Sequence, residues 1–300
     1  MSVSASIPPR STPDPAALIT LLKPVTWFPP MWAFLCGVVS SGIWPGDKWA
    51  LVVLGLILAG PVICGMSQAA NDWCDRHVDA INEPDRPIPS GRVPGRWGLW
   101  VALAMSGLGL AIGWQLGPWG FGATVTAVLA AWAYSCEPVR LKRSGWWGPG
   151  LVGLSYETLP WFTGAAILTV GAPSFEVVTL ALLYGLGAHG IMTLNDFKAL
   201  EGDRATGVRS LPVVLGPEVA AKIACTGMAL PQFVIVPLLL IWGRPWHALG
   251  VATVLVLQLL AMRVLFRDPR AKAPWYNATG VALYVTGMMI AAFAVRSLGT

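Results

Sequence analysis

The chain has 300 residues, of which 55% are hydrophobic and only 12% are charged, whereas soluble domains carry about 25% charged residues. This deficit, a mean hydropathy of +0.62 and the 16 tryptophans exclude an ordinary soluble domain and indicate a membrane protein. The net charge is +5. The start of the chain is polar and rich in Pro and Ser, without the apolar stretch of a cleaved signal peptide. We therefore expect a polar tail over residues 1–15 and one transmembrane domain over residues 16–300.

Nine stretches of the chain are apolar and approach the length of about 20 residues that a helix needs to cross a bilayer. The expected fold is therefore all-α and polytopic, with about nine transmembrane helices. The predicted helices cover residues 24–44, 49–72, 97–115, 118–135, 148–170, 174–195, 217–242, 245–266 and 276–296.

The basic residues predict the orientation of these helices. Seventeen of the 20 Lys and Arg fall at the N-terminus, at the start of the seventh helix and in the loops after helices 2, 4, 6 and 8, all on one side of the membrane. Because cytoplasmic loops carry an excess of Lys and Arg, we place this side and the N-terminus in the cytoplasm. The positive charge is thus a topology signal, and no nucleic-acid partner is needed to explain it.

Eight of the 15 carboxylates lie in two short blocks on the same side. Asn71-Asp72 at the end of the second helix recurs 124 residues later as Asn195-Asp196 at the end of the sixth. The two helices run in the same direction, so the pattern predicts a parallel internal repeat. The first block contains Asp72, Asp75, Asp79, Glu83 and Asp85, and the second contains Asp196, Glu201 and Asp203.

The spacing within these blocks predicts a metal site. If the second helix continues past its apolar part, Asp72, Asp75 and Asp79 share one face with Asn71 beside them. Stacked carboxylates at a helix C-terminus repel one another and oppose the helix dipole unless a cation is bound. Asp196 and Asp203 repeat the spacing of seven residues on the sixth helix. Two such faces form an oxygen-rich site suited to Mg²⁺ that is shared with substrate phosphates.

Basic residues are interleaved with the acids and predict a diphosphate substrate. Mg²⁺ and positively charged side chains together would clamp a diphosphate that carboxylates alone would repel. The alternative is that these are ordinary solvated loops, and for the loop after the fourth helix topology explains the charge equally well. The basic residues concerned are Arg86 and Arg92, Arg140 and Lys142 in the loop after the fourth helix, and Lys198 and Arg204.

Two ionisable residues lie inside predicted spans, where such groups are candidates for function. Glu157 is either a hydrogen-bonded structural acid or a functional group, and His189 either lines a cavity or packs in a contact between helices. The five cysteines form no CxxC pair. We expect them to be reduced packing thiols and not disulfides or zinc ligands.

Together these motifs resemble the UbiA superfamily of intramembrane prenyltransferases. The longer strings Asp75-Arg76-His77-Val78-Asp79-Ala80-Ile81-Asn82-Glu83-Pro84 and Asn195-Asp196-Phe197-Lys198 with Glu201-Gly202-Asp203-Arg204 look like its chlorophyll and bacteriochlorophyll synthase branch. Many members carry a further Asp midway through the second motif, where this chain has Ala199. The second block would therefore bind metal through Asp196 and Asp203, with or without Glu201.

The resemblance implies a UbiA-type bundle with a central cavity and an active site on the cytoplasmic side. It implies Mg²⁺-dependent transfer of a C20 prenyl group, geranylgeranyl or phytyl, from its diphosphate to the C17 propionate of bacteriochlorophyllide, in a bacterial inner or intracytoplasmic photosynthetic membrane. The expected catalytic residues are Asn71, Asp72, Asp75, Asp79, Asp196 and Asp203, of which all except Asp72 would hold metal, and Tyr134 would join the basic residues in binding substrate.

Two other functions stay open at this point. Another prenyltransferase of the superfamily would act on an aromatic or quinone precursor. A cation-coupled transporter would also explain a parallel repeat with membrane carboxylates, but transporters bind near the midplane, and these acids cluster at one face.

Overall fold

The computed structural model describes residues 11–298. All the regular elements in that range are helices, and no strand is assigned there. Of the predicted polar tail, residues 1–10 lie outside the described part of the chain. The α-helices are α1 (Pro15–Leu22), α2 (Phe28–Ser40), α3 (Trp49–Ile57), α4 (Gly65–Asn82), α5 (Trp97–Gln115), α6 (Gly117–Ser135), α7 (Trp147–Gly153), α8 (Leu159–Thr169), α9 (Phe175–Asn195), α10 (Leu200–Thr206), α11 (Leu211–Leu215), α12 (Pro217–Ile241), α13 (Pro245–Leu265) and α14 (Pro269–Val295).

Helices occupy all nine stretches predicted from hydropathy. Within the described residues, six continuous helical runs are long and apolar enough to cross a membrane, so the polytopic fold is confirmed while the count of nine spans stays a prediction. Helix α2 has only 13 residues and is too short by itself to cross the bilayer core.

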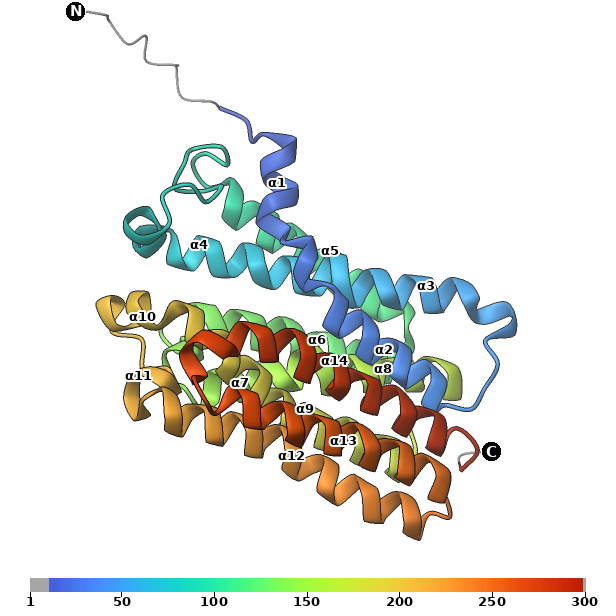
Figure 1. The fold of residues 1–300 in the computed structure, drawn as a ribbon. Coiled ribbons are helices and arrows are strands. Elements are labelled where there is room, and N and C mark those ends of the chain that lie inside the picture. The colour runs from blue at the N-terminus through green and yellow to red at the C-terminus, as the bar shows by residue number, and fades with distance from the viewer. Residues whose placement is uncertain (1–10, 299–300) are drawn as a thin grey trace, which may run out of the picture.

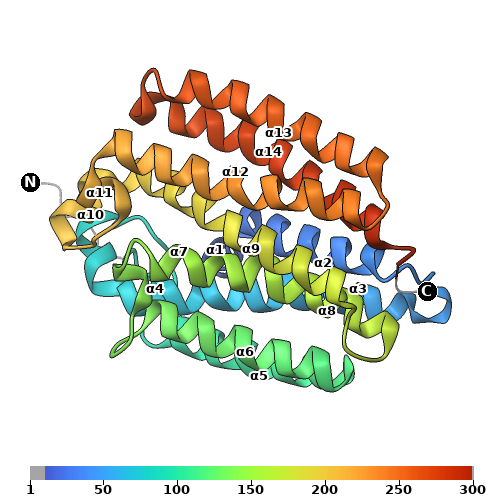
Figure 2. The same ribbon diagram turned by 90° about the horizontal axis from the view of Figure 1, so that it is seen from below.

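The long helices lie side by side and form a bundle whose ends carry the connecting loops (Figure 1). Helices α2, α4, α6, α9 and α14 surround the centre together with the α7 to α8 segment. Helix α5 packs outside α4 and α6, and α12 and α13 pack outside α9 and α14, as Figure 2 shows from below. The elements that carry the two acidic blocks, α4 and α9 to α10, end at the same end of the bundle (Figures 1 and 2).

Two of the long helices contain a π-helical stretch. Residues Leu58–Cys64 join α3 to α4, and Leu154–Thr158 join α7 to α8. Pro61 lies inside the first stretch and Pro160 directly follows the second. Since proline lacks an N–H and its ring collides with the carbonyl of the preceding turn, a local change in helix geometry is expected at both places. π-Helical turns are rare and frequently occur at functional sites.

Small residues allow the helices to approach closely around the centre. A Cβ atom on Gly37 of α2 would collide with the carbonyl oxygen of Trp161 in α8, and one on Gly164 would collide with that of Phe34. The indole of Trp161 is fully buried and donates a hydrogen bond of 2.9 Å to Ser40 Oγ. These contacts fix α2 against α8, as is usual for helix pairs in membranes.

Candidate active site

The first acidic block lies on α4, which continues to Asn82, ten residues past the end of its apolar stretch. The expectation that Asp72, Asp75 and Asp79 lie on one continuous helix is therefore confirmed. Asp72 is 1% exposed, and its Oδ1 accepts hydrogen bonds from Lys23 Nζ at 2.8 Å and from Arg86 Nη1 at 3.3 Å. Its Oδ2 is buried without a partner among the described residues, so one oxygen remains available for a ligand.

Arg86 connects Asp72 to the end of the same helix. Its Nη1 donates to Asp79 Oδ2 at 2.9 Å, and its Nε donates to Glu83 Oε2 at 2.6 Å. Burial lowers the pKa of this guanidinium, but the hydrogen bonds to Glu83 and the charges of Asp72 and Asp79 outweigh burial and raise the pKa above its usual value. Arg86 is thus a permanent cation between two buried carboxylates.

Asp75, the third acid of this face, is paired with a different loop. Arg140 Nη2 donates to Asp75 Oδ1 at 2.7 Å, and Lys142 Nζ donates to the other oxygen. Burial is the largest influence on Lys142 and lowers the pKa of its ammonium group, while the negative charge of Asp75 opposes this shift. The loop after α6, which topology alone could explain, therefore reaches the first block directly.

The same loop also contacts the segment that follows the second block. The amide of Arg209 donates to the carbonyl oxygen of Arg143 at 3.1 Å, and that of Gly145 donates back to the Arg209 carbonyl oxygen at 3.0 Å. Residues 140–145 therefore connect the first acidic block with the segment that follows the second.

The expectation that all five cysteines are free is wrong for two of them. Cys74 of α4 and Cys136 at the end of α6 form a disulfide, with Cα atoms 5.5 Å apart, a separation typical of disulfides. The 62 residues between them hide this proximity in the sequence. Cys36, Cys64 and Cys225 are buried free thiols, as expected.

The second block differs from the predicted geometry. A 3₁₀ turn, Asp196–Ala199, separates α9 from α10, so Asp196 and Asp203 do not lie on one continuous α-helix. The expected spacing of two turns along one helix face is therefore wrong for this pair. Neither acid forms an ion pair within residues 11–298. Asn195, by contrast, is held by a hydrogen bond of 2.5 Å from Asn277 Nδ2 of α14.

The residues at this end of the bundle fit a magnesium ion by their chemistry. All the candidate ligands are oxygen donors, and three of them, Asp75, Asp196 and Asp203, lie within the electrostatic reach of Tyr134. Asp72, which is not among the predicted ligands, has a buried oxygen without a partner in the described residues. In the described part of the chain no three acidic, His or Cys side chains converge closely enough to hold a metal. Arg86, Arg140 and Lys142 hold the first-block acids instead.

A cavity of about 700 Å³ opens beside the two blocks. Its walls are apolar for the most part and come from the start of α2, the π-helical stretch before α4, α4, α6, α7, α9 and α14. Its polar lining includes four of the predicted site residues or their neighbours, Asn71, Tyr134, Asn195 and Lys198, and also Gln68, Tyr156, Glu157 and Asn277.

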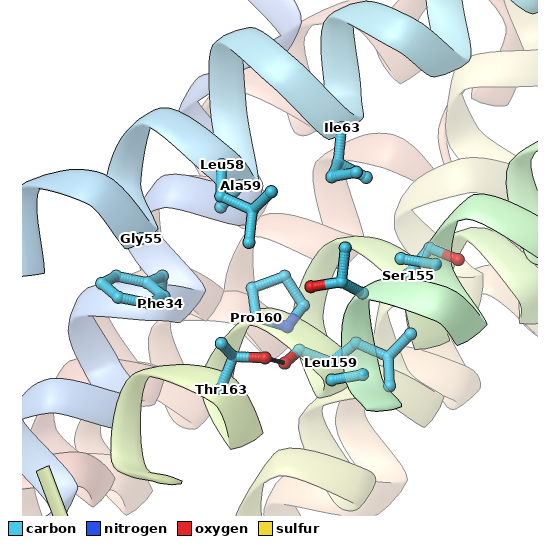
Figure 3. A pocket seen from close by; sticks show the side chains of 12 residues that line it. Phe34, Gly55, Leu58, Ala59, Ile63, Ser155, Leu159, Pro160 and Thr163 are labelled. Atoms are coloured by element: carbon cyan, nitrogen blue, oxygen red, sulfur yellow. Dashed lines mark hydrogen bonds between the residues drawn. The ribbon is translucent and has the colours of Figure 1, made fainter. Parts of the chain in front are cut away.

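A small apolar recess of about 30 Å³ adjoins this cavity (Figure 3). Both share the lining residues Ala59, Ile63, Ala127 and Ser155. Phe34 and Pro160 lie on its wall (Figure 3). The large cavity is lined by earlier residues of the same helical segments, Pro29 and Pro30 in one and residues between 151 and 157 in the other. The cavity thus has a polar mouth and an apolar far end.

Several predicted residues lie away from this arrangement. Arg92 is exposed and bonds within its own turn, donating to Ser90 Oγ at 3.1 Å and to the Asp85 carbonyl oxygen at 2.6 Å. Arg204 is exposed. His189 does not line the cavity; its ring packs against Trp146, with centroids 5.5 Å apart. Of the two roles predicted for His189, lining the cavity or packing between helices, the structure shows packing.

Four residues near the acidic blocks are not among those predicted from the sequence. Lys23 pairs with Asp72, and its place at the start of the first predicted helix, on the same side of the membrane as the first block, is a usable signal. Gln68 lies three residues before Asn71, close to one helical turn, which is a usable signal. No pattern in the sequence points to Ser135 or Asn277, because only the packing of α6 and α14 brings them to Asn71 and Asn195.

Comparison with known proteins places this geometry in a family. The profile described as the UbiA prenyltransferase family matches residues 26–294. The chain is 72% identical to the bacteriochlorophyll synthase 33 kDa chain of Cereibacter sphaeroides, over 99% of both chains. It is 37% identical to the chloroplastic chlorophyll synthase of Arabidopsis thaliana, over 92% of this chain and 73% of the relative.

Solved structures share the fold. A UbiA homolog from Archaeoglobus fulgidus, described as bound to GPP and Mg²⁺, superposes with a TM-score of 0.71 at 21% sequence identity, over 94% of this chain and 99% of that one. At this identity the likeness shows the fold alone.

Proposed function

The chain belongs to the UbiA prenyltransferase family, and from this premise we propose that it transfers a C20 prenyl group, geranylgeranyl or phytyl, from its diphosphate to the C17 propionate of bacteriochlorophyllide. The observation that carries this choice of substrate is the 72% identity to a bacteriochlorophyll synthase over 99% of both chains. The family match favours a transferase over the cation-coupled transporter, and no observation favours a different acceptor.

Basic residues beside the two acidic blocks supply the groups that hold the diphosphate, and one of them, Lys198, also lines the cavity. Arg140, Lys142 and Lys198 present positive charge beside the acidic blocks, and charge-assisted hydrogen bonds to phosphate oxygens are strong. Mg²⁺, held by Asn71, Asp75, Asp79, Asp196 and Asp203, would neutralise charge on the leaving diphosphate. Support for this set comes from the oxygen donors around Tyr134 and from the metal named for the A. fulgidus homolog.

The reaction follows from this placement. The bond between C1 of the prenyl group and its bridging oxygen breaks, and the electron pair leaves with the diphosphate. A propionate oxygen then bonds to C1 and forms the ester. A propionate is ionised at neutral pH, so no residue has to act as a general base. Tyr134 and Tyr156 line the cavity, and aromatic rings there can stabilise an allylic cation.

The cavity walls protect this cation from water. They are mostly apolar between the mouth and the recess of Figure 3. Water that reached the cation would yield a prenyl alcohol, so exclusion of water directs it to the propionate.

The protein is a multi-pass membrane protein. We propose that it lies in the bacterial inner or intracytoplasmic membrane with its N-terminus and both acidic blocks in the cytoplasm. The asymmetry of Lys and Arg supports this orientation.

Purified protein incubated with bacteriochlorophyllide, geranylgeranyl diphosphate and Mg²⁺ tests the reaction. Chromatography should show an esterified pigment that is absent when Mg²⁺ is chelated. If no esterified pigment forms while an aromatic quinone precursor is prenylated under the same conditions, the acceptor assignment is wrong.

A further inference from the structure

Glu157 is a carboxyl group that the proposed reaction does not use. It lies in the π-helical stretch Leu154–Thr158, lines the cavity and is only 3% exposed. Its Oε2 is buried and has no hydrogen-bond partner within the described residues, and no Lys, Arg or His there forms an ion pair with it. A buried polar atom without a partner is costly and requires an explanation.

Its depth separates it from the diphosphate. The helical run that contains Glu157 begins at Trp147, so at 1.5 Å per residue the carboxyl lies about 15 Å from the start of that run. That is about half of a hydrocarbon core about 30 Å thick. Glu157 is therefore near the middle of the membrane, away from both acidic blocks.

The polar groups beside it are already paired. The hydroxyl of Tyr156 accepts hydrogen bonds from Gln68 Nε2 at 3.0 Å and Cys64 Sγ at 3.2 Å, and it lies 3.3 Å from Ser67 Oγ. This cluster joins the two π-helical segments across the cavity. Among the side chains that line the cavity at this depth, Glu157 is the one with a buried oxygen that has no partner within the described residues; the unpartnered hydroxyl of Tyr184 does not line the cavity.

We propose that Glu157 donates a hydrogen bond to a carbonyl oxygen at the edge of the macrocyclic acceptor. The inference rests on the proposed function and identifies how the same cavity recognises its acceptor. A diphosphate would be repelled by a carboxylate and binds at the mouth. A prenyl chain has no polar atom. The macrocycle is the one substrate part that can bring a hydrogen-bonding group to this depth.

The surroundings of Glu157 favour its role as a donor. Burial of an isolated carboxylate costs far more free energy than burial of a neutral acid, and no cation compensates the charge here. A neutral carboxylic acid carries one O–H, which a ring carbonyl accepts. Glu157 is thus an acceptor-binding residue. It orients the macrocycle while the propionate points toward the diphosphate.

Binding of the acceptor alone tests this role. The full-length wild type, Glu157→Gln and Glu157→Leu are titrated with bacteriochlorophyllide, without prenyl diphosphate or Mg²⁺, and binding is followed by quenching of tryptophan fluorescence. We expect the Leu variant to bind about ten-fold more weakly, because one hydrogen bond is lost and a carbonyl is left unpaired. The Gln variant should restore most of the affinity through its amide N–H.

Kinetics distinguish this role from a general structural one. The KM for bacteriochlorophyllide should rise in the Leu variant, while the KM for geranylgeranyl diphosphate and the Mg²⁺ dependence stay unchanged. Glu218→Gln, at an exposed position at the start of α12, is the matched control. Glu157→Met provides a second variant without a donor if the Leu variant does not accumulate.

Two acceptors distinguish which carbonyl is bound. Chlorophyllide carries one peripheral carbonyl fewer than bacteriochlorophyllide, so weaker binding of both assigns a shared carbonyl, and weaker binding of bacteriochlorophyllide alone assigns the additional one. If neither acceptor is affected in the Leu and Met variants, Glu157 is a buried structural acid only and the inference is overturned. A wild type that does not esterify bacteriochlorophyllide would instead refute the proposed function.

Discussion

The two acidic blocks share residue types and lie at the same end of the bundle, yet their environments differ. In the first block, Lys23, Arg86, Arg140 and Lys142 pair with the three acids of α4. In the second block, Asp196 and Asp203 have no ion-pair partner within residues 11–298. Of the second block only Glu201 has an ion-pair partner there, Arg270. The folded chain thus pairs all three acids of α4 by itself and leaves Asp196 and Asp203 for a bound cation to neutralise.

The difference indicates that the two blocks have different roles in binding the substrate and the metal. Arg86, Arg140 and Lys142 hold the first block in place. We propose that they also bind the diphosphate, so that they exchange a carboxylate for a phosphate when substrate binds. The second block, next to the cavity and close to Tyr134, holds negative charge that a cation would neutralise.

Removal of one acid from each block should give the largest effect on activity. We expect Asp75→Ala and Asp203→Ala each to lower turnover about 10³-fold, since each removes a group that acts on the developing charge. Their effects on stability should differ. Asp75→Ala takes the shared acid from Arg140, which keeps Glu137, and from Lys142, which keeps no ion-pair partner among the described residues, so the thermal midpoint should fall. Asp203→Ala breaks no ion pair within residues 11–298 and should not lower the midpoint.

Esterification rates and thermal unfolding in detergent measure both effects. Asp85→Ala, in the exposed turn after α4, is the control and should keep its rate. If both variants lost the same stability, the proposed difference in charge pairing between the two blocks would be wrong.

The next largest effect should come from Arg86→Ala, which should lower the free energy of unfolding. Asp72 and Asp79 are both buried and would lose their shared cation. Breaking a buried pair in this way costs about 3 kcal/mol. A chemical unfolding series in detergent measures the loss, with the exposed Arg204→Ala as the matched control, expected within about 0.5 kcal/mol of wild type.

The disulfide should stabilise the first block. Replacement of Cys74 and Cys136 by Ser is expected to lower stability by about 2 kcal/mol. Dithiothreitol should lower the thermal midpoint of the wild type to that of the double variant and leave the double variant unchanged. If wild-type Cys74 reacts fully with a maleimide without reductant, the bond does not form in the protein.

Arg140→Ala should give the smallest effect, on substrate affinity. One charge-assisted hydrogen bond to the diphosphate is lost, while Lys142 stays in place, so the KM for geranylgeranyl diphosphate should rise about ten-fold. The KM for bacteriochlorophyllide should not change. A larger effect on the acceptor would place Arg140 beside the macrocycle.

Much of the candidate site was predictable because its residues lie close in sequence. Asp72, Asp75 and Asp79 share one helix, and their spacing alone places them on one face. The second block was predicted less well, since a 3₁₀ turn at Asp196–Ala199 changes the rotation of the chain between its two acids. A single turn of different pitch cannot be recognised from residue spacing.

The amino-acid sequence by itself determined the class of fold, the apolar stretches and the two charged blocks, because hydropathy and helical spacing are local properties. Only the tertiary structure decided which charges meet. Arg140 and Lys142 reach Asp75 across more than 60 residues, Cys136 reaches Cys74, and Asn277 reaches Asn195. These contacts depend on how α4, α6 and α14 pack. Packing likewise places Glu157 on the cavity wall with a buried oxygen that has no partner within the described residues.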